Sequence, residues 1–266
     1  PGNDTIRGLQ GGDTAVGGPG DDTYYYNPGD GKVVIQDVAA QGEGNSIVFG
    51  DGITPDQVSL VADSGTLILR LGPNGDEIDL STFDPQDAFG EHAVDTFVFA
   101  DGTVLSYEDL MQKGFQITGT EGEDYLPGTS AQDTLIGLGG DDIFEAGAGN
   151  DVLDGGPGND IYIFNPGDGI DTIRDIASPN VGNVVYFGVG ISSWDLSLSV
   201  DGNTLVITVG STGDQLRLDY FYSSQAYDTI SVNTFQFADG TVMSGAQLLD
   251  MGITIEGTPG DDQLAG

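Results

Sequence analysis

Aspartate recurs at a nine-residue spacing along parts of this chain, and no other feature restricts the possible folds as strongly. An apolar residue stands two places after every aspartate that keeps the spacing, which is too regular for chance in a chain that is 38% hydrophobic. The aspartates are Asp4, Asp13, Asp22, Asp124, Asp133, Asp142, Asp151, Asp160 and Asp262, and the apolar residues are Ile6, Ala15, Tyr24, Leu126, Leu135, Phe144, Leu153, Tyr162 and Leu264.

Each nine-residue unit has a glycine-rich half and a half centred on the apolar residue, as in Gly155–Ile163. Glycine tolerates positive φ and close backbone approach, so the first half predicts a turn. The second half predicts a very short strand whose middle side chain points inward. One unit buries almost nothing alone, so two units should form one coil of a flattened solenoid, and successive coils should stack. Residues two units apart, such as Asp124 and Asp142, would then lie directly above one another.

A longer repeat encloses the short one, because the chain aligns with itself without a gap at a 138-residue shift. Phe97–Val104, for example, falls on Phe235–Val242. The chain is therefore slightly under two copies of one module and is expected to be a piece of a longer protein. The predicted domains are a first repeat array with its closing segment at 1–37, a β domain at 38–117, a second array at 118–175, a second β domain at 176–255 and the start of a third array at 256–266.

The two predicted β domains alternate apolar and polar residues in short runs, which is typical of strands. Asp63-Ser64-Gly65 and Asp201-Gly202-Asn203 predict hairpin turns, and Asp101-Gly102 and Asp239-Gly240 repeat that signal. Short helices are expected at residues 106–113 and 244–251, each beginning at a serine. No longer amphipathic helix is visible, so the sequence predicts an all-β fold.

Composition excludes several classes of function. The chain has 43 Asp plus Glu against 6 Lys plus Arg, a formal charge of −37, which disfavours nucleic acid, anionic membranes and acidic polysaccharides as partners. There is no cysteine, and His92 is the only histidine, so thiolate chemistry and histidine zinc clusters are excluded. His92 aligns with Ile230 in the other copy, which argues against a catalytic role. No run of about 18 apolar residues is present, so no membrane span is expected.

Stacking of successive coils would align many carboxylates, and these need a counter-charge. Residues 118–175 hold 13 acidic residues and one base, Arg174. A chain this acidic could be disordered, but its apolar content suffices for a core once the charge is neutralised. Carboxylate and carbonyl oxygens in flexible turns suit Ca²⁺ better than Mg²⁺, which demands a stricter octahedron. A series of solvated acidic turns is the simpler alternative, and the shared register of aspartate, glycine and apolar residues disfavours it.

The pattern Gly-Gly-x-Gly-x-Asp-x-apolar-x resembles the RTX (repeats-in-toxin) nonapeptide, a calcium-binding β-helix repeat. The intervening segments, with their Phe-x-Phe-Ala-Asp-Gly-Thr-Val block, resemble the haemolysin-type calcium-binding-related domain. The resemblance implies an all-β fold in which parallel β-roll (β-solenoid) segments alternate with small, mainly antiparallel β domains in a tandem 138-residue repeat. It also implies about four to eight Ca²⁺ ions, each held between the turns of successive coils by carbonyls and by one aspartate from each turn.

Carried over to this chain, the resemblance implies calcium ligands in both arrays and a bridging role for Asp142, which would serve two ions. The implied ligands of the first array are Gly2, Asp4, Gly11, Asp13, Gly17, Pro19 and Asp22. Those of the second array are Thr120, Gly122, Asp124, Thr129, Ala131, Asp133, Gly137, Leu138, Gly139, Gly140, Asp142, Ala146, Gly147, Ala148, Gly149, Asp151, Gly155, Pro157, Asp160 and Asp171. Turn 128–131 lacks most of its glycines, and Val33 stands where the second array has Asp171, so sites there should be weaker.

The resemblance implies a non-catalytic, calcium-binding module of a large secreted bacterial protein, found outside the cell or on its surface. Such a module would fold on binding calcium outside the cell, act as a spacer, and suit export by type I secretion machinery. A calcium-dependent adhesion or glycan-binding module is an alternative, as is the non-catalytic C-terminal part of a secreted toxin or hydrolase. Trp194 is more easily interpreted as a packing or surface residue than as a platform for a sugar ring.

Overall fold

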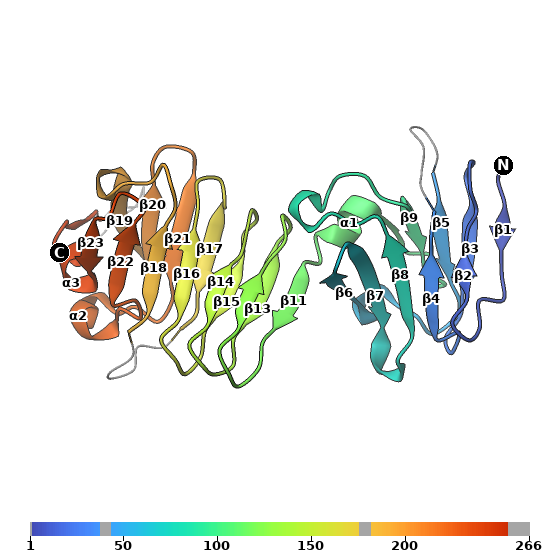
Figure 1. The fold of residues 1–266 in the computed structure, drawn as a ribbon, viewed down its shortest axis with the longest axis horizontal. Helices are drawn as coiled ribbons and strands as arrows, with labels where there is room; N and C mark the ends of the chain where they lie inside the picture. The colour runs from blue at the N-terminus through green and yellow to red at the C-terminus, as the bar shows by residue number, and fades with distance from the viewer. Residues whose placement is uncertain (1, 38–43, 176–181, 255–266) are drawn as a thin grey trace, which may run out of the picture. The chain divides into compact units, whose positions relative to one another are not determined.

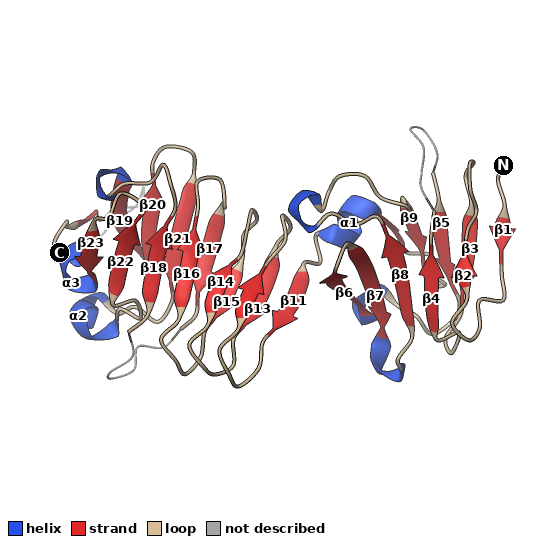
Figure 2. Ribbon diagram, in the orientation of Figure 1, coloured by secondary structure: helices blue, strands red, loops and turns tan. Residues whose placement is uncertain are grey.

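A computed structural model describes residues 2–37, 44–175 and 182–254, so the predicted third array lies outside the described residues. The chain divides into two compact units. Unit 1 comprises the chain up to Gln116 together with Thr129–Gln132, and unit 2 comprises Ile117–Gly128 and the chain from Asp133 onward. Figure 2 shows that both units consist of strands joined by turns, with short helices at a few connections.

The strands of unit 1 form two sheets, in the orders β1-β3-β5-β9-β10 and β2-β4-β8-β7-β6-β11 (Figure 1). The elements are β1 Thr5–Ile6, β2 Thr14–Ala15, β3 Thr23–Tyr26, β4 Lys32–Ile35, β5 Ser46–Phe49, β6 Val58–Asp63, β7 Thr66–Leu71, β8 Glu77–Ser81, β9 Thr96–Val98, β10 Val104–Ser106, α1 Tyr107–Met111 and β11 Phe115–Thr118, with 3₁₀ turns at Pro55–Gln57, Gly72–Asn74 and Pro85–Asp87.

Unit 2 repeats this arrangement, with strand orders β12-β14-β16-β18-β22-β23 and β13-β15-β17-β21-β20-β19-β24. The elements are β12 Tyr125–Pro127, β13 Asp133–Ile136, β14 Ile143–Glu145, β15 Val152–Asp154, β16 Ile161–Phe164, β17 Ile170–Ile173, β18 Val184–Phe187, β19 Leu196–Asp201, β20 Thr204–Val209, β21 Asp214–Leu218, α2 Ala226–Thr229, β22 Thr234–Phe237, β23 Val242–Ser244, α3 Gly245–Leu249 and β24 Ile253–Thr254, with 3₁₀ turns at Ser193–Asp195 and Ser223–Gln225.

Coils stack at the expected spacing of two nine-residue units. Tyr125 pairs in parallel with Ile143, and Ile143 with Ile161, while Thr134 pairs with Val152 on the other sheet. The apolar residue two places after each aspartate points inward. Those side chains are buried at Ala15, Tyr24, Leu126, Leu135, Phe144, Leu153 and Tyr162, and Ile6 is half-buried. In unit 2 the inward side chains of both sheets meet in one hydrophobic core, which stabilises the stack.

The segments between the arrays extend both sheets of the roll. In unit 2, β18 and β22 continue one sheet in parallel from β16, and β21 continues the other in parallel from β17. Antiparallel pairing is found within β19-β20-β21 and between β22 and β23. Unit 1 has the same pattern of parallel strands followed by antiparallel hairpins.

The predicted hairpins and helices are present. β6 and β7 are joined by Ser64-Gly65, and the φ angles of 48° and 81° there match the turn that favours glycine. Ser106 caps α1, because its hydroxyl oxygen accepts a hydrogen bond from the Asp109 amide at 3.1 Å, and Ser244 does the same for α3. Both helices are shorter than expected and end at Met111 and Leu249. Among the described residues, no helix combines the length and apolarity needed to cross a membrane.

Candidate metal centre

The repeated aspartates of the second array form two rows, one along each edge of the roll, at the point where each short strand begins. Asp133, Asp142, Asp151, Asp160 and Asp171 are at most 1% exposed. In each row, one carboxylate oxygen of an aspartate accepts the backbone amide of the aspartate in the preceding coil. The donor–acceptor distances are 2.9 Å from Asp124 to Asp142, 3.0 Å from Asp142 to Asp160, 2.7 Å from Asp133 to Asp151 and 3.1 Å from Asp151 to Asp171.

The second carboxylate oxygen is the unusual one. The Oδ2 atoms of Asp142, Asp151, Asp160 and Asp171 in unit 2, and of Asp22 in unit 1, are buried and have no hydrogen-bond partner. A buried anionic oxygen without a partner is costly, by about 1–3 kcal/mol or more. A cation beside each of these atoms would remove that cost, so the donor chemistry fits a metal ion.

Glycine lets carboxylate and carbonyl oxygens approach the backbone closely at the start of several turns. A Cβ built on Gly119 would lie 2.8 Å from Asp124 Oδ2 and 3.0 Å from the Gly137 carbonyl oxygen. A Cβ on Gly137 would overlap Asp142 Oδ2 and lie 2.7 Å from the Gly155 carbonyl oxygen. In both cases the Cβ position lies close to a carboxylate oxygen of its own turn and to a carbonyl oxygen of the corresponding turn in the next coil. Calcium typically binds such oxygens at about 2.3–2.6 Å.

This geometry brings together several of the expected ligands. Besides the pairs at Gly119 and Gly137, Asp133 Oδ2 lies near the Ala146 carbonyl at the Cβ position of Gly128. The Gly122 carbonyl lies 2.6 Å from the Cβ position of Gly140. Other expected carbonyls accept backbone hydrogen bonds: Thr120 from Gly139 at 3.4 Å, and Pro157 from Gly140 at 3.1 Å. Within the ranges that the structure describes, no three Asp, Glu or His side chains converge, so the oxygens available at each point are a mixture of carboxylate and carbonyl.

Burial raises the pKa of the row carboxylates. It raises the pKa of Asp160 to about 7, with the nearby charges of Asp175 and Asp142 adding to the effect. Burial also raises the pKa of Asp142, and it raises the pKa of both Asp151 and Asp171, which are hydrogen-bonded neighbours in one row. Without a cation these groups therefore hold protons more readily than exposed aspartates do.

The first array has fewer buried repeat aspartates than the second array. Asp4 and Asp13 are exposed, and the residue at the place of Asp171 is the buried Val33. Asp22 is fully buried, and its Oδ2 crowds the Cβ position of Gly17, as in the second array. The expected ligands Gly2 and Pro19 are hydrogen-bonded to each other at 2.7 Å, and the Gly11 amide donates to the Asp30 carbonyl.

The asparagine that follows Asp142 and Asp160 in their row was missed by sequence reasoning. Asp160 donates its amide to Asn183 Oδ1 at 2.9 Å, so a neutral amide side chain takes the next place in the row. The Asn183 amide and the Tyr162 hydroxyl both donate to the buried Asp175. Unit 1 repeats this group with Tyr24, Asp37 and Asn45. The signal was available, because all three residue types recur at the 138-residue shift.

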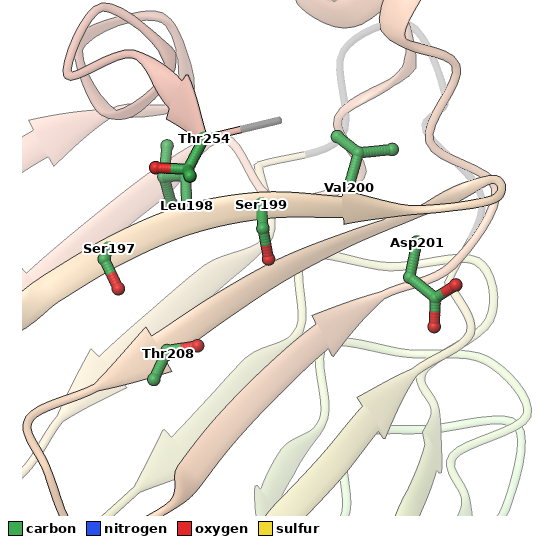
Figure 3. Close-up of a pocket in the computed structure, with 7 residues that line it drawn as sticks. All are labelled: Ser197, Leu198, Ser199, Val200, Asp201, Thr208 and Thr254. Atoms are coloured by element: carbon green, nitrogen blue, oxygen red, sulfur yellow. The ribbon is translucent and has the colours of Figure 1, made fainter. Parts of the chain in front are cut away.

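Other conspicuous residues lie outside the rows. Asp101 and Asp239 accept amides of their own turns, from Thr103 and Thr241 at 2.8 Å, as expected for plain turn residues. Trp194 is 89% exposed. A hollow along β19 contains none of the row carboxylates and is lined mainly by hydroxyl and other small side chains (Figure 3): Ser197, Leu198, Ser199, Val200, Asp201, Thr208 and Thr254.

Models of known families match both parts of the 138-residue repeat, the nonapeptide arrays and the segments between them. A model described as RTX calcium-binding nonapeptide repeat (4 copies) matches residues 1–33 and 127–162. A model described as haemolysin-type calcium binding protein related domain matches residues 67–109 and 205–247, the same stretch of each copy. No curated protein matches the chain.

Solved structures similar to the chain include an extracellular lipase and a subunit of an epimerase. The extracellular lipase LipA from Serratia marcescens is 16% identical over 96% of this chain, with a TM-score of 0.31, and the chain spans 40% of the length of the lipase. The AlgE6R3 subunit of the mannuronan C5-epimerase from Azotobacter vinelandii is 24% identical, covers 55% of this chain and 94% of its own length, and has a TM-score of 0.22. At these TM-scores neither likeness adds to the fold described above.

Gly137→Ala should weaken calcium binding, because its methyl group would occupy the point between Asp142 Oδ2 and the Gly155 carbonyl. We expect the calcium midpoint to rise at least about tenfold, equivalent to about 1.4 kcal/mol. Gly122→Ala is the matched control, since the nearest atom to its Cβ position is 3.8 Å away. Isothermal titration with calcium distinguishes the two, and equal midpoints for both variants would contradict a role for these two oxygens in calcium binding.

Acidification should favour the calcium-free fold. Asp160 has a folded-state pKa of about 7, above the ordinary aspartate value near 4, so the folded chain binds protons more tightly than the unfolded chain. Stability without calcium should therefore be fully present below about pH 4 and be lost as pH rises through about 7. Far-UV circular dichroism in chelator should show more β signal at acidic than at alkaline pH, and Asp160→Asn should reduce the difference. A β signal that falls on acidification would refute this account.

Proposed function

We propose that this chain, which carries RTX calcium-binding nonapeptide repeats and haemolysin-type calcium-binding-related domains, is a module of a secreted protein that folds as Ca²⁺ fills its carboxylate rows. The observation that carries the proposal is the set of buried aspartate oxygens that lack a hydrogen-bond partner, of which Asp142 Oδ2 lies close to the same point as the Gly155 carbonyl of the next coil. Calcium would supply the missing positive charge at each of these points.

Electrostatics supports coupling between binding and folding. Two like charges 4 Å apart repel by about 1 kcal/mol in water and by about 4 kcal/mol near a protein surface. The second array stacks such pairs repeatedly, with 13 acidic residues against one base between residues 118 and 175. Binding free energy at sites absent from the unfolded chain becomes folding free energy. We expect about four to eight ions, with more of them in the second array.

Calcium dependence would restrict folding of the module to the outside of the cell. Extracellular modules bind calcium with dissociation constants of about 10⁻⁴–10⁻³ M, so such sites stay empty at cytosolic calcium levels and fill outside the cell. A chain that stays open inside the cell and closes outside it suits export in an unfolded state, which type I secretion of the parent protein would provide. In this proposal the folded roll is a structural spacer, and we assign it no catalytic residue.

The direct test is removal of calcium from the chain. In excess chelator at mildly alkaline pH we expect most of the β signal to disappear and the hydrodynamic radius to increase, because the uncompensated carboxylates repel one another. Circular dichroism and small-angle scattering, with magnesium as the control ion, check this expectation. An unchanged spectrum and radius in chelator would rule the proposal out.

The position of an aspartate in its row should determine how strongly it contributes to calcium binding. Asp142 has a partner in the coils on both sides, Asp124 and Asp160, whereas Asp4 is linked to Asp22. Asp142→Ala should disturb two ion sites and destabilise the second array by about 2 kcal/mol or more. Asp4→Ala should affect only one terminal coil. Calcium titrations followed by circular dichroism should show a clear rise in the midpoint for Asp142→Ala alone, and similar midpoints for the two variants would refute the bridging role.

A further inference from the structure

The last coil of each array has no further nonapeptide coil beside it, so its backbone amides need other hydrogen-bond acceptors. In an inner coil, the amide of the first turn glycine donates to a carbonyl of the next coil, as from Gly137 to Asp154 at 2.8 Å. The amide of the row aspartate donates to the next aspartate, as from Asp142 to Asp160 at 3.0 Å. The chain leaves the nine-residue repeat after the coil of Asp160, and with it both kinds of acceptor.

Side chains supply the acceptors that a further coil would have provided in unit 2. The Gly155 amide, the first of its turn, is hydrogen-bonded to the Tyr162 hydroxyl oxygen. The Asp160 amide donates to Asn183 Oδ1 at 2.9 Å. The Tyr162 hydroxyl donates to Asp175 at 2.9 Å, and the side-chain amide of Asn183 donates to the same carboxylate oxygen. Three side chains thus form one connected group at the end of the array.

Unit 1 contains the same group at the 138-residue shift. The Gly17 amide donates to the Tyr24 hydroxyl oxygen at 2.9 Å, and the Asp22 amide donates to Asn45 Oδ1 at 2.8 Å. Asp37 accepts hydrogen bonds from the side chains of both Tyr24 and Asn45. The group is therefore common to both copies, although the two arrays differ in their number of buried aspartates.

Asp37 and Asp175 differ from the row aspartates in how their charge is satisfied. They are 2% and 3% exposed, and each accepts hydrogen bonds from a hydroxyl and a carboxamide. Within the described part of the chain, neither has a fully buried oxygen that lacks a hydrogen-bond partner, in contrast to Asp142 and Asp160. Hydrogen bonds to a carboxylate stabilise its charged form. These two carboxylates therefore need no cation.

The tyrosine hydroxyl is found in the coil that lacks a following coil. Phe144 has the place of Tyr162 in the preceding coil, and the two rings stack with centroids 5.0 Å apart. The amide of Gly137, in the turn before Phe144, already has a backbone carbonyl as its acceptor. An aromatic ring thus fills the core in both coils, and the hydroxyl is added where a turn amide would otherwise lose its partner.

We infer that a cation-free array cap closes each array, in which three side chains take the place of a further coil and mark where calcium binding ends on that edge of the roll. The array caps are Tyr162, Asp175 and Asn183 in unit 2, and Tyr24, Asp37 and Asn45 in unit 1. In this inference, which rests on the proposed calcium function of the rows, Asp175 is not a calcium ligand and Tyr162 is a positioning residue for the turn that begins at Gly155.

Counting bound calcium tests whether the array cap is free of cations. The full 266-residue chain is dialysed against saturating calcium, and the bound ions are counted. Asp175→Asn keeps the size of the side chain and one acceptor oxygen, and we expect an unchanged number of ions. Asp142→Asn, the matched change within the row, should lower that number by at least one. A lower count for the folded Asp175→Asn variant would overturn the inference, because Asp175 would then be a calcium ligand.

Amide hydrogen exchange in saturating calcium tests the positioning role. Tyr162→Phe installs the residue type of the preceding coil, so the chain should still fold while the Gly155 amide loses its acceptor. We expect exchange at Gly155 to become at least about fivefold faster and exchange at Gly137 to stay unchanged. Tyr125→Phe is the matched control, because it removes an exposed hydroxyl that donates to Glu145, and it should alter neither rate.

The exchange experiment also decides the matter if Asp175→Asn does not fold. An unchanged rate at Gly155 in Tyr162→Phe, or an equal acceleration at Gly155 and Gly137, would overturn the inference, since the second result is what general destabilisation produces. Failure of the wild-type chain to gain structure with calcium would instead contradict the calcium proposal, and this is measured first.

Discussion

Burial of stacked carboxylates is the constraint on which the rest of the structure depends. Successive coils of the second array place aspartates along the same edge, and one oxygen of Asp142 and of Asp160 already accepts a backbone amide of the preceding coil. The other oxygen has no hydrogen-bond partner in Asp142, Asp151, Asp160 and Asp171, so the stack contains a repeated deficit of positive charge. The glycines follow from the same constraint, because a side chain at Gly137 would occupy the space between the two oxygens that face each other there.

Sequence reasoning reached the fold and the rows because both depend on fixed spacings. The nine-residue step places Asp142 and Phe144 in a definite relation, and the coil of two such steps makes their neighbours above and below predictable. The pairing of strands outside the arrays was harder to predict from the sequence. Alternating apolar residues show that Val184–Phe187 is a strand, but they do not show that it joins β16 in parallel across a longer connection. The end of the row was missed for a similar reason, since Asp160 meets Asn183 only after the chain has left the repeat.

Comparison of the two copies separates what the architecture requires from what can vary. Both copies retain the tyrosine, aspartate and asparagine that close one row. They differ on the other edge, where Asp171 in unit 2 has an unpartnered oxygen and the hydrophobic Val33 takes its place in unit 1. The buried valine needs no counter-ion at that position. The two copies therefore have the same strand arrangement but bury different numbers of carboxylates that need a cation.

The pairing distances along the chain have a consequence for the order of assembly. Coils inside an array pair residues that are close in sequence, such as Tyr125 and Ile143, so closing each new loop costs little conformational entropy, and the array can grow by adding one coil to the last. The strands that complete each unit pair over much longer separations, with Val185 joining Phe235. Such long-range contacts form slowly. A chain emerging gradually from a pore would therefore close its arrays almost as they appear, while each unit as a whole would be completed only after its last hairpin had emerged.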